Sequence, residues 1–266
     1  MDWNEIVKKI TPYIVKIETP AGHGTGFLCL YNEERQSCGV ATACHVVEYA
    51  DQWQQPIRIT QPSTQQFAFL QEGERIIFTD PVRDSAVIIL PVGKLELPQD
   101  LVPLRPIENL LLIGDEVGWL GFPALGRDSD TLCFFSGNVS ARQESRHAYL
   151  IDGVAINGVS GGPVLYSSPA DGLQIVGAIT AYIANRATGE TLPGLAVAQD
   201  VSHVHDTAST IKSLDEARRK RMEQQAATPP AVAPSEAGDL HPVPPASLFP
   251  PEKQSKPILK RRKKSR

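Results

Sequence analysis

The chain has 266 residues, of which 41% are hydrophobic and 21% are charged, and its formal net charge is −4. This length allows one large domain or two small ones, and the composition is that of an ordinary globular protein. No apolar run approaches the ~18 residues that a membrane-spanning helix needs, and the N-terminal segment lacks the apolar centre of a secretory signal. We therefore expect a cytoplasmic protein without membrane contact.

The four cysteines, Cys29, Cys38, Cys44 and Cys133, form no Cys-x-x-Cys pair. Without a secretory signal, such a set predicts reduced thiols rather than a disulfide framework. Cys29 and Cys38 could face each other across a hairpin, but we prefer buried free thiols.

The chain opens with helical spacing of Trp3, Ile6, Val7 and Ile10, which Pro12 ends. Short segments rich in β-branched residues then follow, separated by turn residues. They cover 13–19, 24–32, 38–47, 57–60, 67–70, 75–79 and 85–92, and, after the proline-bearing stretch 97–109, also 116–122, 131–141, 148–153, 163–167, 174–184 and 194–198. Strands that recur without intervening helices indicate an antiparallel sandwich or barrel.

From Thr207 the apolar spacing is helical again, and Ile211, Leu214 and Met222 form one stripe. Residues 228–266 are rich in proline and poor in large apolar side chains, so we expect them to be disordered. The last fifteen residues hold eight of the 26 Lys and Arg side chains but only one of the 30 Asp and Glu side chains. A basic tail therefore follows an acidic body.

Three residues in these segments carry groups that hydrolytic chemistry uses. We expect VATACHVV (40–47) to be a buried strand ending in His45, and Asp84 lies just before another apolar strand. Ser160 lies in INGVSGGP (156–163), where glycines allow a tight turn. The order His, Asp, Ser is one of the known chain orders of the Ser-His-Asp triad.

Each residue also has an ordinary structural interpretation. Asp80 is an alternative acid, although its position beside a proline suits a turn. Cys44 could be a thiol nucleophile, but as a strand neighbour of His45 it would point to the opposite face and pack inward. His203 and His205 would share one face of a strand and could bind a metal, but no further ligand is evident nearby. We therefore expect neither a metal nor a cofactor.

Nine segments in matching order are similar to landmarks of one family: ITPYIVKIET, GTGFL, TACHVV, RDSAVIIL, IGDEVGWLGFP, SGNVSA, INGVSGGPV, IVGAITA and GLAVA. Together they resemble the trypsin/chymotrypsin-fold serine peptidases, and among these the HtrA-like (Deg) branch, over roughly residues 3–200. The resemblance implies an all-β fold of two six-stranded antiparallel β-barrels with the site in the cleft between them. We accordingly expect the N-terminal helix and first barrel in 1–105, the second barrel in 106–205, a C-terminal helix in 206–227 and the disordered tail in 228–266.

The resemblance also implies a role for each site residue. Ser160 would attack the scissile carbonyl of a polypeptide, His45 would carry the proton, and Asp84 would orient the imidazole. The backbone N–H groups of Gly158 and Ser160 would face the developing oxyanion. The primary specificity pocket would be formed by Val154, Ala155, Ile179, Thr180 and Ala181. Because Val154 is not an acid, we expect small or medium aliphatic residues before the scissile bond. The strand 179–181 would pair with the extended substrate backbone.

Two departures from the family pattern limit what can be carried over. Val159 occupies the position at which activated trypsin-type enzymes keep an Asp for the newly cut N-terminus, so we expect no activation by such a cleavage. The segment after residue 200 is too short and too rich in proline for the PDZ domain that HtrA-like enzymes usually carry.

Two other classes of function deserve comparison. A protease-fold scaffold could bind peptides along the same strand without cutting them, and labelling of Ser160 by an organophosphonate would separate this scaffold from an enzyme. A nucleic-acid-associated protein would use the basic run KRRKK (260–264) to contact phosphates. The sequence has no aromatic residues interleaved with this run, so we expect polyanion contact only as an accessory role of the tail.

Overall fold

The computed structural model describes residues 2–125, 130–185 and 192–227, so the predicted tail lies outside the described residues. The chain begins with helix α1 (Trp3–Ile10) and the short 3-10 helix η1 (Thr11–Tyr13). The next elements are β1 (Ile14–Thr19), β2 (Gly22–Tyr31), β3 (Ser37–Ala43), helix α2 (Cys44–Gln52), β4 (Ile57–Gln61), β5 (Gln66–Leu70), η2 (Glu72–Glu74), β6 (Ile76–Asp80) and β7 (Ser85–Pro91). They are followed by β8 (Glu116–Gly121), β9 (Cys133–Gln143), η3 (Glu144–Arg146), β10 (Ala148–Asp152), β11 (Pro163–Ser168), β12 (Gly172–Asn185), β13 (Leu192–Asp200) and helix α3 (Ser202–Ala227).

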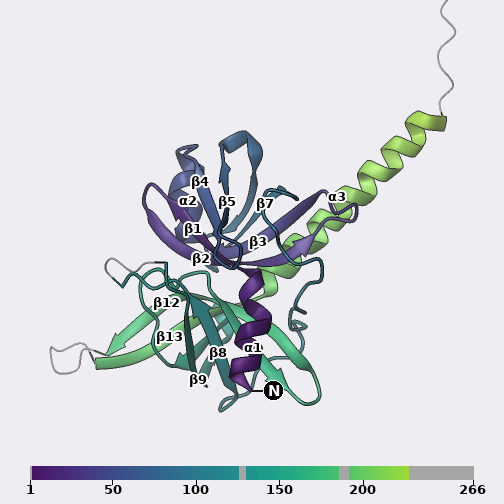
Figure 1. Cartoon of the computed structure of the whole chain (residues 1–266). Coiled ribbons are helices and arrows are strands. Elements are labelled where there is room, and N and C mark those ends of the chain that lie inside the picture. Colours follow the sequence, from purple (N-terminus) through teal and green to yellow (C-terminus); the bar gives the residue numbers. More distant parts are fainter. Residues whose placement is uncertain (1, 126–129, 186–191, 228–266) are drawn as a thin grey trace, which may run out of the picture. The chain divides into compact units, whose positions relative to one another are not determined.

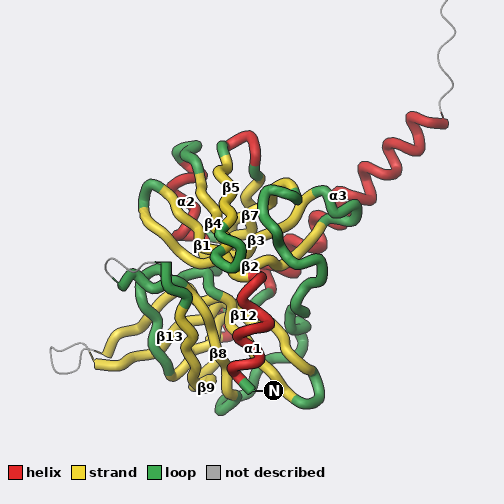
Figure 2. Tube along the Cα trace, in the orientation of Figure 1, coloured by secondary structure: helices red, strands yellow, loops and turns green. Residues whose placement is uncertain are grey.

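The strands form two antiparallel sheets (Figure 1, and by element type in Figure 2). The first is a half-barrel of seven strands in the order β5-β4-β1-β2-β3-β7-β6, and the second is a closed barrel in the order β10-β13-β12-β11-β8-β9. The predicted all-β double-barrel fold is confirmed. The family resemblance implied six strands in the first barrel, whereas the sheet has seven, one for each of the seven segments predicted before the stretch 97–109. The two short segments at 67–70 and 75–79 are separate strands, because β5 pairs with β4 and β6 pairs with β7.

Three apolar clusters hold these sheets together. One fills the half-barrel, and another fills the closed barrel around Trp119 and Val159. The third lies between the sheets and also receives the buried faces of α1 and the start of α3. The sequence of strand β7 is continuously apolar because both of its faces are buried. Ile88 packs in the half-barrel cluster, whereas Val87 and Ile89 pack in the cluster between the sheets. Burial of both faces thus joins the two sheets along one seam.

Two segments that we predicted as strands are helical. The predicted strand 40–47 ends at Ala43, and helix α2 begins at Cys44, whose N–H makes the last cross-strand bond of this register, to the Asp84 carbonyl. The strand expected for His203 and His205 is also wrong. There, α3 begins at Ser202, whose N–H and hydroxyl both donate to Asp200. The Asp200 carboxylate thereby satisfies the first N–H of the helix, which has no partner within the helix itself.

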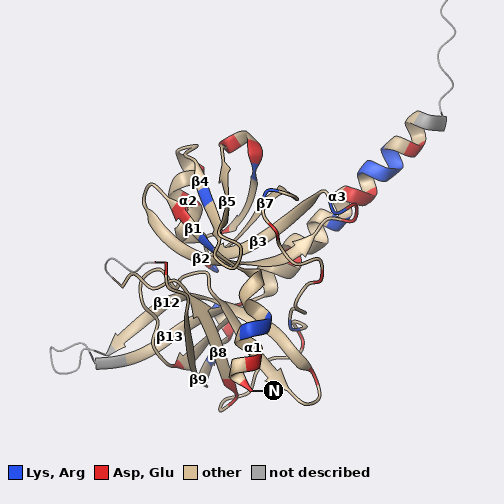
Figure 3. Cartoon of the chain, viewed as in Figure 1, with Lys and Arg blue, Asp and Glu red and all other residues tan. Residues whose placement is uncertain are grey.

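Helix α3 is only partly packed against the sheets. Ile211 contacts the cluster between the sheets, whereas Leu214 and Met222 are exposed, so the predicted apolar stripe is not buried as a whole. The second half of α3 carries many charges (Figure 3), and it pairs Arg219 with Glu33 of the β2–β3 connection. Among the helices of the described residues, none combines the length and apolar character needed to cross a bilayer.

Candidate active site

The short connection between β6 and β7 places Asp84 against the start of α2. One carboxylate oxygen of Asp84 accepts the His45 backbone N–H at 2.9 Å, and the other lies 2.8 Å from His45 Nδ1. An ionised carboxylate can only accept, so Nδ1 donates and Nε2 keeps its lone pair. The hydrogen bond to Asp84 raises the pKa of His45 above its ordinary value, against an opposing effect of burial and with a smaller contribution from Glu48. The pair therefore presents an oriented base.

The two alternatives at this corner have other roles. Asp80 accepts the backbone N–H groups of Val82 and Arg83 and thereby closes the turn, and no hydrogen bond within the described residues joins it to His45. Cys44 is buried, as expected, although it lies on a helix rather than on a strand. Burial raises the pKa of its thiol to about 12, so Cys44 is not a thiolate at neutral pH.

Two consecutive β-turns share Val159, and Ser160 is the second residue of the second turn. The Val159 N–H donates to the Ile156 carbonyl at 3.0 Å, and the Gly162 N–H donates to the Val159 carbonyl at 2.9 Å. The third residue of each turn is a glycine with positive φ, Gly158 at +93° and Gly161 at +84°. This is the type II pattern, which requires glycine or a similar residue at that position. The glycine-rich sequence is therefore explained by the two turns that present Ser160.

Strand β2 of the half-barrel binds these turns directly. The Thr25 N–H donates to the Ser160 carbonyl at 2.8 Å, and the Thr25 hydroxyl donates to the Gly158 carbonyl at 2.8 Å. The same hydroxyl accepts the Phe122 N–H, and His23 Nε2 lies 3.1 Å from the Phe122 carbonyl. Sequence analysis did not single out Thr25 or His23, because their partners are about a hundred residues away in the chain.

The backbone amides of the turn leave two donors available. Within the described residues, the N–H groups of Gly158 and Ser160 donate to no other group, whereas those of Val159, Gly161 and Gly162 are all bonded. The Ser160 hydroxyl likewise has no hydrogen-bond partner among the described residues, including His45. Both amides and the hydroxyl are therefore free to bond to a ligand.

Val46, which follows His45, and Ser160 both lie close to Gly24. A Cβ atom built on Gly24 would lie 2.5 Å from a methyl carbon of Val46 and 3.0 Å from the Ser160 carbonyl oxygen. Gly24 thus allows α2 and the Ser160 turn to come close. The structure bonds Asp84 to His45 and places both the start of α2 and the Ser160 turn against Gly24.

The residues expected to form the primary specificity pocket are only partly gathered. Ile179 is buried in the core of the closed barrel, and its N–H and C=O bond to Gly162 and Gly161. Thr180 and Ala181 follow on the edge of β12 and line a cavity of about 740 Å³ together with Asp84. Val154 is half exposed, and Ala155 packs against the barrel core. The edge available to a ligand therefore begins at Thr180 rather than at Ile179.

The histidines considered as metal ligands have separate partners. His203 Nδ1 lies 2.9 Å from the Ser85 hydroxyl, and His205 Nε2 lies 2.9 Å from the Arg105 carbonyl. In residues 2–125, 130–185 and 192–227, no group of three or more His, Cys, Asp or Glu side chains is arranged to hold a metal ion.

Comparison with known proteins agrees with this arrangement. The family described as trypsin-like peptidase domain matches residues 24–171, more than half of the chain. No curated protein matches the chain. Two crystal structures of Rv3671c, a protease of M. tuberculosis H37Rv, are similar in fold, both in the inactive form and one with a serine-to-alanine mutation. The mutant shares 18% identity at a TM-score of 0.53, with 78% of this chain and 90% of that chain covered. The other shares 19% identity at a TM-score of 0.53, with 79% and 93% covered. The chain therefore belongs to the trypsin-like peptidase family and is a serine-type peptidase.

Proposed function

We propose that the chain is a serine endopeptidase in which Ser160 is the nucleophile, His45 the general base and Asp84 the orienting acid. The observation that carries this proposal is the 2.8 Å contact between His45 Nδ1 and Asp84, which leaves Nε2 as the proton acceptor. The two turns around Ser160 support it, because they leave the hydroxyl and two neighbouring amides without partners in the described residues. A nucleophile, an oriented base and two anion donors are the parts that acyl transfer requires.

Each part has a defined step. Ser160 Oγ forms a bond to the scissile carbonyl carbon while its proton passes to His45 Nε2. The carbonyl oxygen becomes an oxyanion and is stabilised by the Gly158 and Ser160 N–H groups. His45 then gives its proton to the leaving amine as the C–N bond breaks. Water repeats the sequence on the acyl-enzyme and restores the Ser160 hydroxyl.

The turn needs no ion pair from a cleaved N-terminus in this proposal. Val159, which precedes Ser160, is completely buried in the core of the closed barrel. Apolar packing of this side chain, together with the bonds from Thr25, supports the turn in the intact chain. Full-length protein should therefore be active without processing at its N-terminus.

The preferred substrate has a small or medium aliphatic residue before the scissile bond. Val154, Ala155, Thr180 and Ala181 present no charge, and a Lys or Arg head group without a counter-charge would lose several kcal/mol on desolvation. Cleavage of an unbiased peptide library, followed by mass spectrometry of the products, tests this preference. Preferred cleavage after Lys or Arg would contradict it.

The catalytic assignment is tested by an organophosphonate that labels an activated serine. Wild-type protein should be labelled once, at Ser160, and Ser160→Ala should abolish the label. For peptide cleavage we expect Ser160→Ala and His45→Ala to lower kcat by roughly 10⁴–10⁶, and Asp84→Asn by about 10⁴. Asp80→Asn, which keeps an acceptor oxygen for the turn, is the matched control. An unlabelled, folded wild type would instead favour a peptide-binding scaffold.

A further inference from the structure

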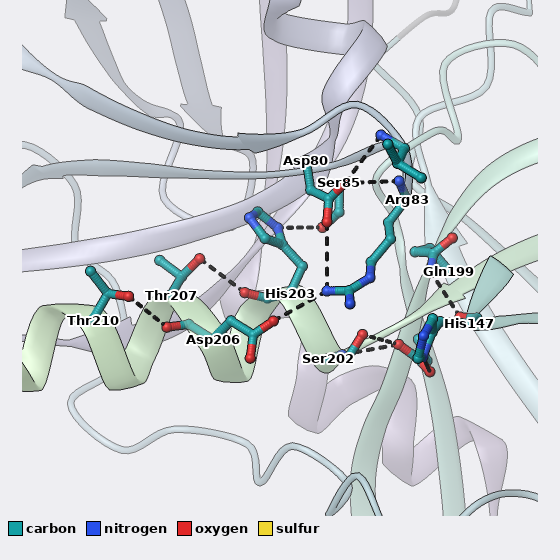
Figure 4. A network of polar contacts seen from close by, with 12 residues as sticks. Asp80, Arg83, Ser85, His147, Gln199, Ser202, His203, Asp206, Thr207 and Thr210 are labelled. Carbon is teal, nitrogen blue, oxygen red and sulfur yellow. Dashed lines mark hydrogen bonds and ion pairs between the residues drawn. The ribbon is translucent and has the colours of Figure 1, made fainter. Parts of the chain in front are cut away.

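The residues on both sides of Asp84 are held by one turn of α3 (Figure 4). Arg83, which precedes Asp84, donates from Nη1 to Asp206 at 3.1 Å. Ser85, which follows Asp84, lies 2.9 Å from His203 Nδ1 through its hydroxyl. Residues three apart in a helix share one face, so His203 and Asp206 act on the turn from the same side.

The turn that carries Asp84 needs such support. Asp84 has φ +48°, a left-handed conformation that costs a residue with a side chain of the order of 1 kcal/mol or more. Asp80 closes the front of the turn through its bonds to the Val82 and Arg83 N–H groups. These contacts lie within the loop itself. The Cys44 and His45 N–H groups, which both donate to Asp84, tie the loop to the start of α2. The contacts from α3 hold the loop from a second element.

The start of α3 is in turn anchored to the closed barrel. Asp200, the last residue of β13, accepts both donors of Ser202, and its other carboxylate oxygen accepts Arg142 at 2.7 Å. His203 and Ser85 are both buried, so the bond between them is shielded from water. A continuous chain of contacts therefore runs from the closed barrel through α3 to the acid of the half-barrel.

We propose that α3 positions the catalytic acid, with His203 and Asp206 as the positioning residues. The inference rests on the proposed function, because it assigns the contacts of α3 to the alignment of Asp84 with His45. Neither residue contacts the Ser160 turn, so their loss should lower kcat and leave KM nearly unchanged. A displacement of about 1 Å at a catalytic group can cost about 100-fold in rate. We expect a 10- to 100-fold fall in kcat when both contacts are removed.

The test uses the full chain with His203→Ala and Asp206→Ala, singly and together. The control is His205→Ala, which removes a bond of the same kind from α3 to a different loop. We measure kcat, KM, thermal stability and the pH midpoint of His45, followed both by kcat/KM and by NMR titration of its ring. The midpoint should move down toward the ordinary value of 6.5 in the His203 and Asp206 variants only.

The conservative variants distinguish a displacement of Asp84 from the loss of a charge near His45. His203 is flanked by Asp80, Arg83 and Asp206, and burial lowers its pKa, so it is neutral at pH 7 and its loss removes no charge there. Asp206→Asn removes the charge but keeps an acceptor for Arg83, and His203→Asn keeps a polar group for Ser85. Both conservative variants should recover most of the lost kcat. Asp206 is largely exposed, so its variants should fold even where His203→Ala does not.

Two results would overturn the proposal. One is that all α3 variants, the control included, lose stability while kcat and the His45 midpoint stay at wild-type values. The other is failure of the conservative variants to recover either readout. If wild-type protein is folded but inactive, the NMR midpoint of His45 still decides whether α3 positions Asp84. If this midpoint then moves in the His203 and Asp206 variants, the proposed function fails but the role of α3 stands.

Discussion

Replacement of Gly161 by alanine should damage both the stability and the activity of the protein. Gly161 has φ +84°, and an added Cβ would lie 2.1 Å from the Thr25 carbonyl oxygen, 2.2 Å from the Thr42 hydroxyl and 2.9 Å from the Ala43 N. A left-handed alanine costs about 1–2 kcal/mol, and forcing an atom into a packed site adds about 1–3 kcal/mol. We therefore expect Gly161→Ala to lower the free energy of unfolding by about 2–5 kcal/mol.

The chain offers a matched control in Gly172, at the start of β12. Its φ is +70°, but a Cβ there would meet nothing within 4 Å. Gly172→Ala should therefore cost only the backbone component, about 1–2 kcal/mol, and should leave kcat unchanged. In Gly161→Ala the clash also pushes on the segment that leads into His45, so kcat should fall by at least about 100-fold. Urea unfolding and peptide cleavage measure the two effects. Equal destabilisation by both substitutions, or wild-type kcat in Gly161→Ala, would refute the reasoning.

Three further outcomes are expected. Because Asp84 raises the pKa of His45, kcat/KM should rise with pH through a midpoint above 6.5 and then level off, and a flat profile from about pH 5 to 9 would contradict the base role. Because burial lowers the pKa of His203, the stability that its neutral form confers is present above about 6.5 and lost as pH falls toward the folded pKa; urea unfolding at several pH values should show a shallower acid slope in His203→Asn. A chain ending at Ala227 should cut peptides normally but lose salt-sensitive retention on heparin, and equal retention of both chains would show that the basic tail does not bind polyanions.

Local sequence patterns predicted the strands well because each strand is short, β-branched and bounded by turn residues. The prediction was wrong where the same apolar pattern fits both a strand and a helix. VATACHVV is a continuous apolar run, and such a run cannot distinguish a buried strand from a buried helix. Here the strand ends at Ala43 and helix α2 follows, with the Cys44 N–H bonded to Asp84, about forty residues further along the chain. No local signal contains that contact.

In the candidate site, too, local sequence predicted some residues and missed others. The order of His45, Asp84 and Ser160, together with the glycines around Ser160, was sufficient to nominate the residues. The groups that hold them were not visible in the sequence, because Thr25 and His203 bond to residues more than a hundred positions away. Their types, a threonine in a strand and a histidine after a strand, are common in any fold. Only the three-dimensional arrangement distinguishes them from ordinary surface and core residues.

The bonds from Thr25 to the Ser160 turn have a consequence for protein synthesis. Domains fold as units, with the N-terminal part first as the chain emerges. A chain synthesised as far as β7 already contains His45 and Asp84 but lacks Ser160, the proposed nucleophile. The Ser160 turn emerges next and gains its partners only when the closed barrel docks on β2. Helix α3, which emerges after the closed barrel, then reaches back to the residues beside Asp84. If the proposed mechanism holds, a nascent chain therefore gains proteolytic activity only after both sheets have emerged, and a shorter chain cannot cut its neighbours.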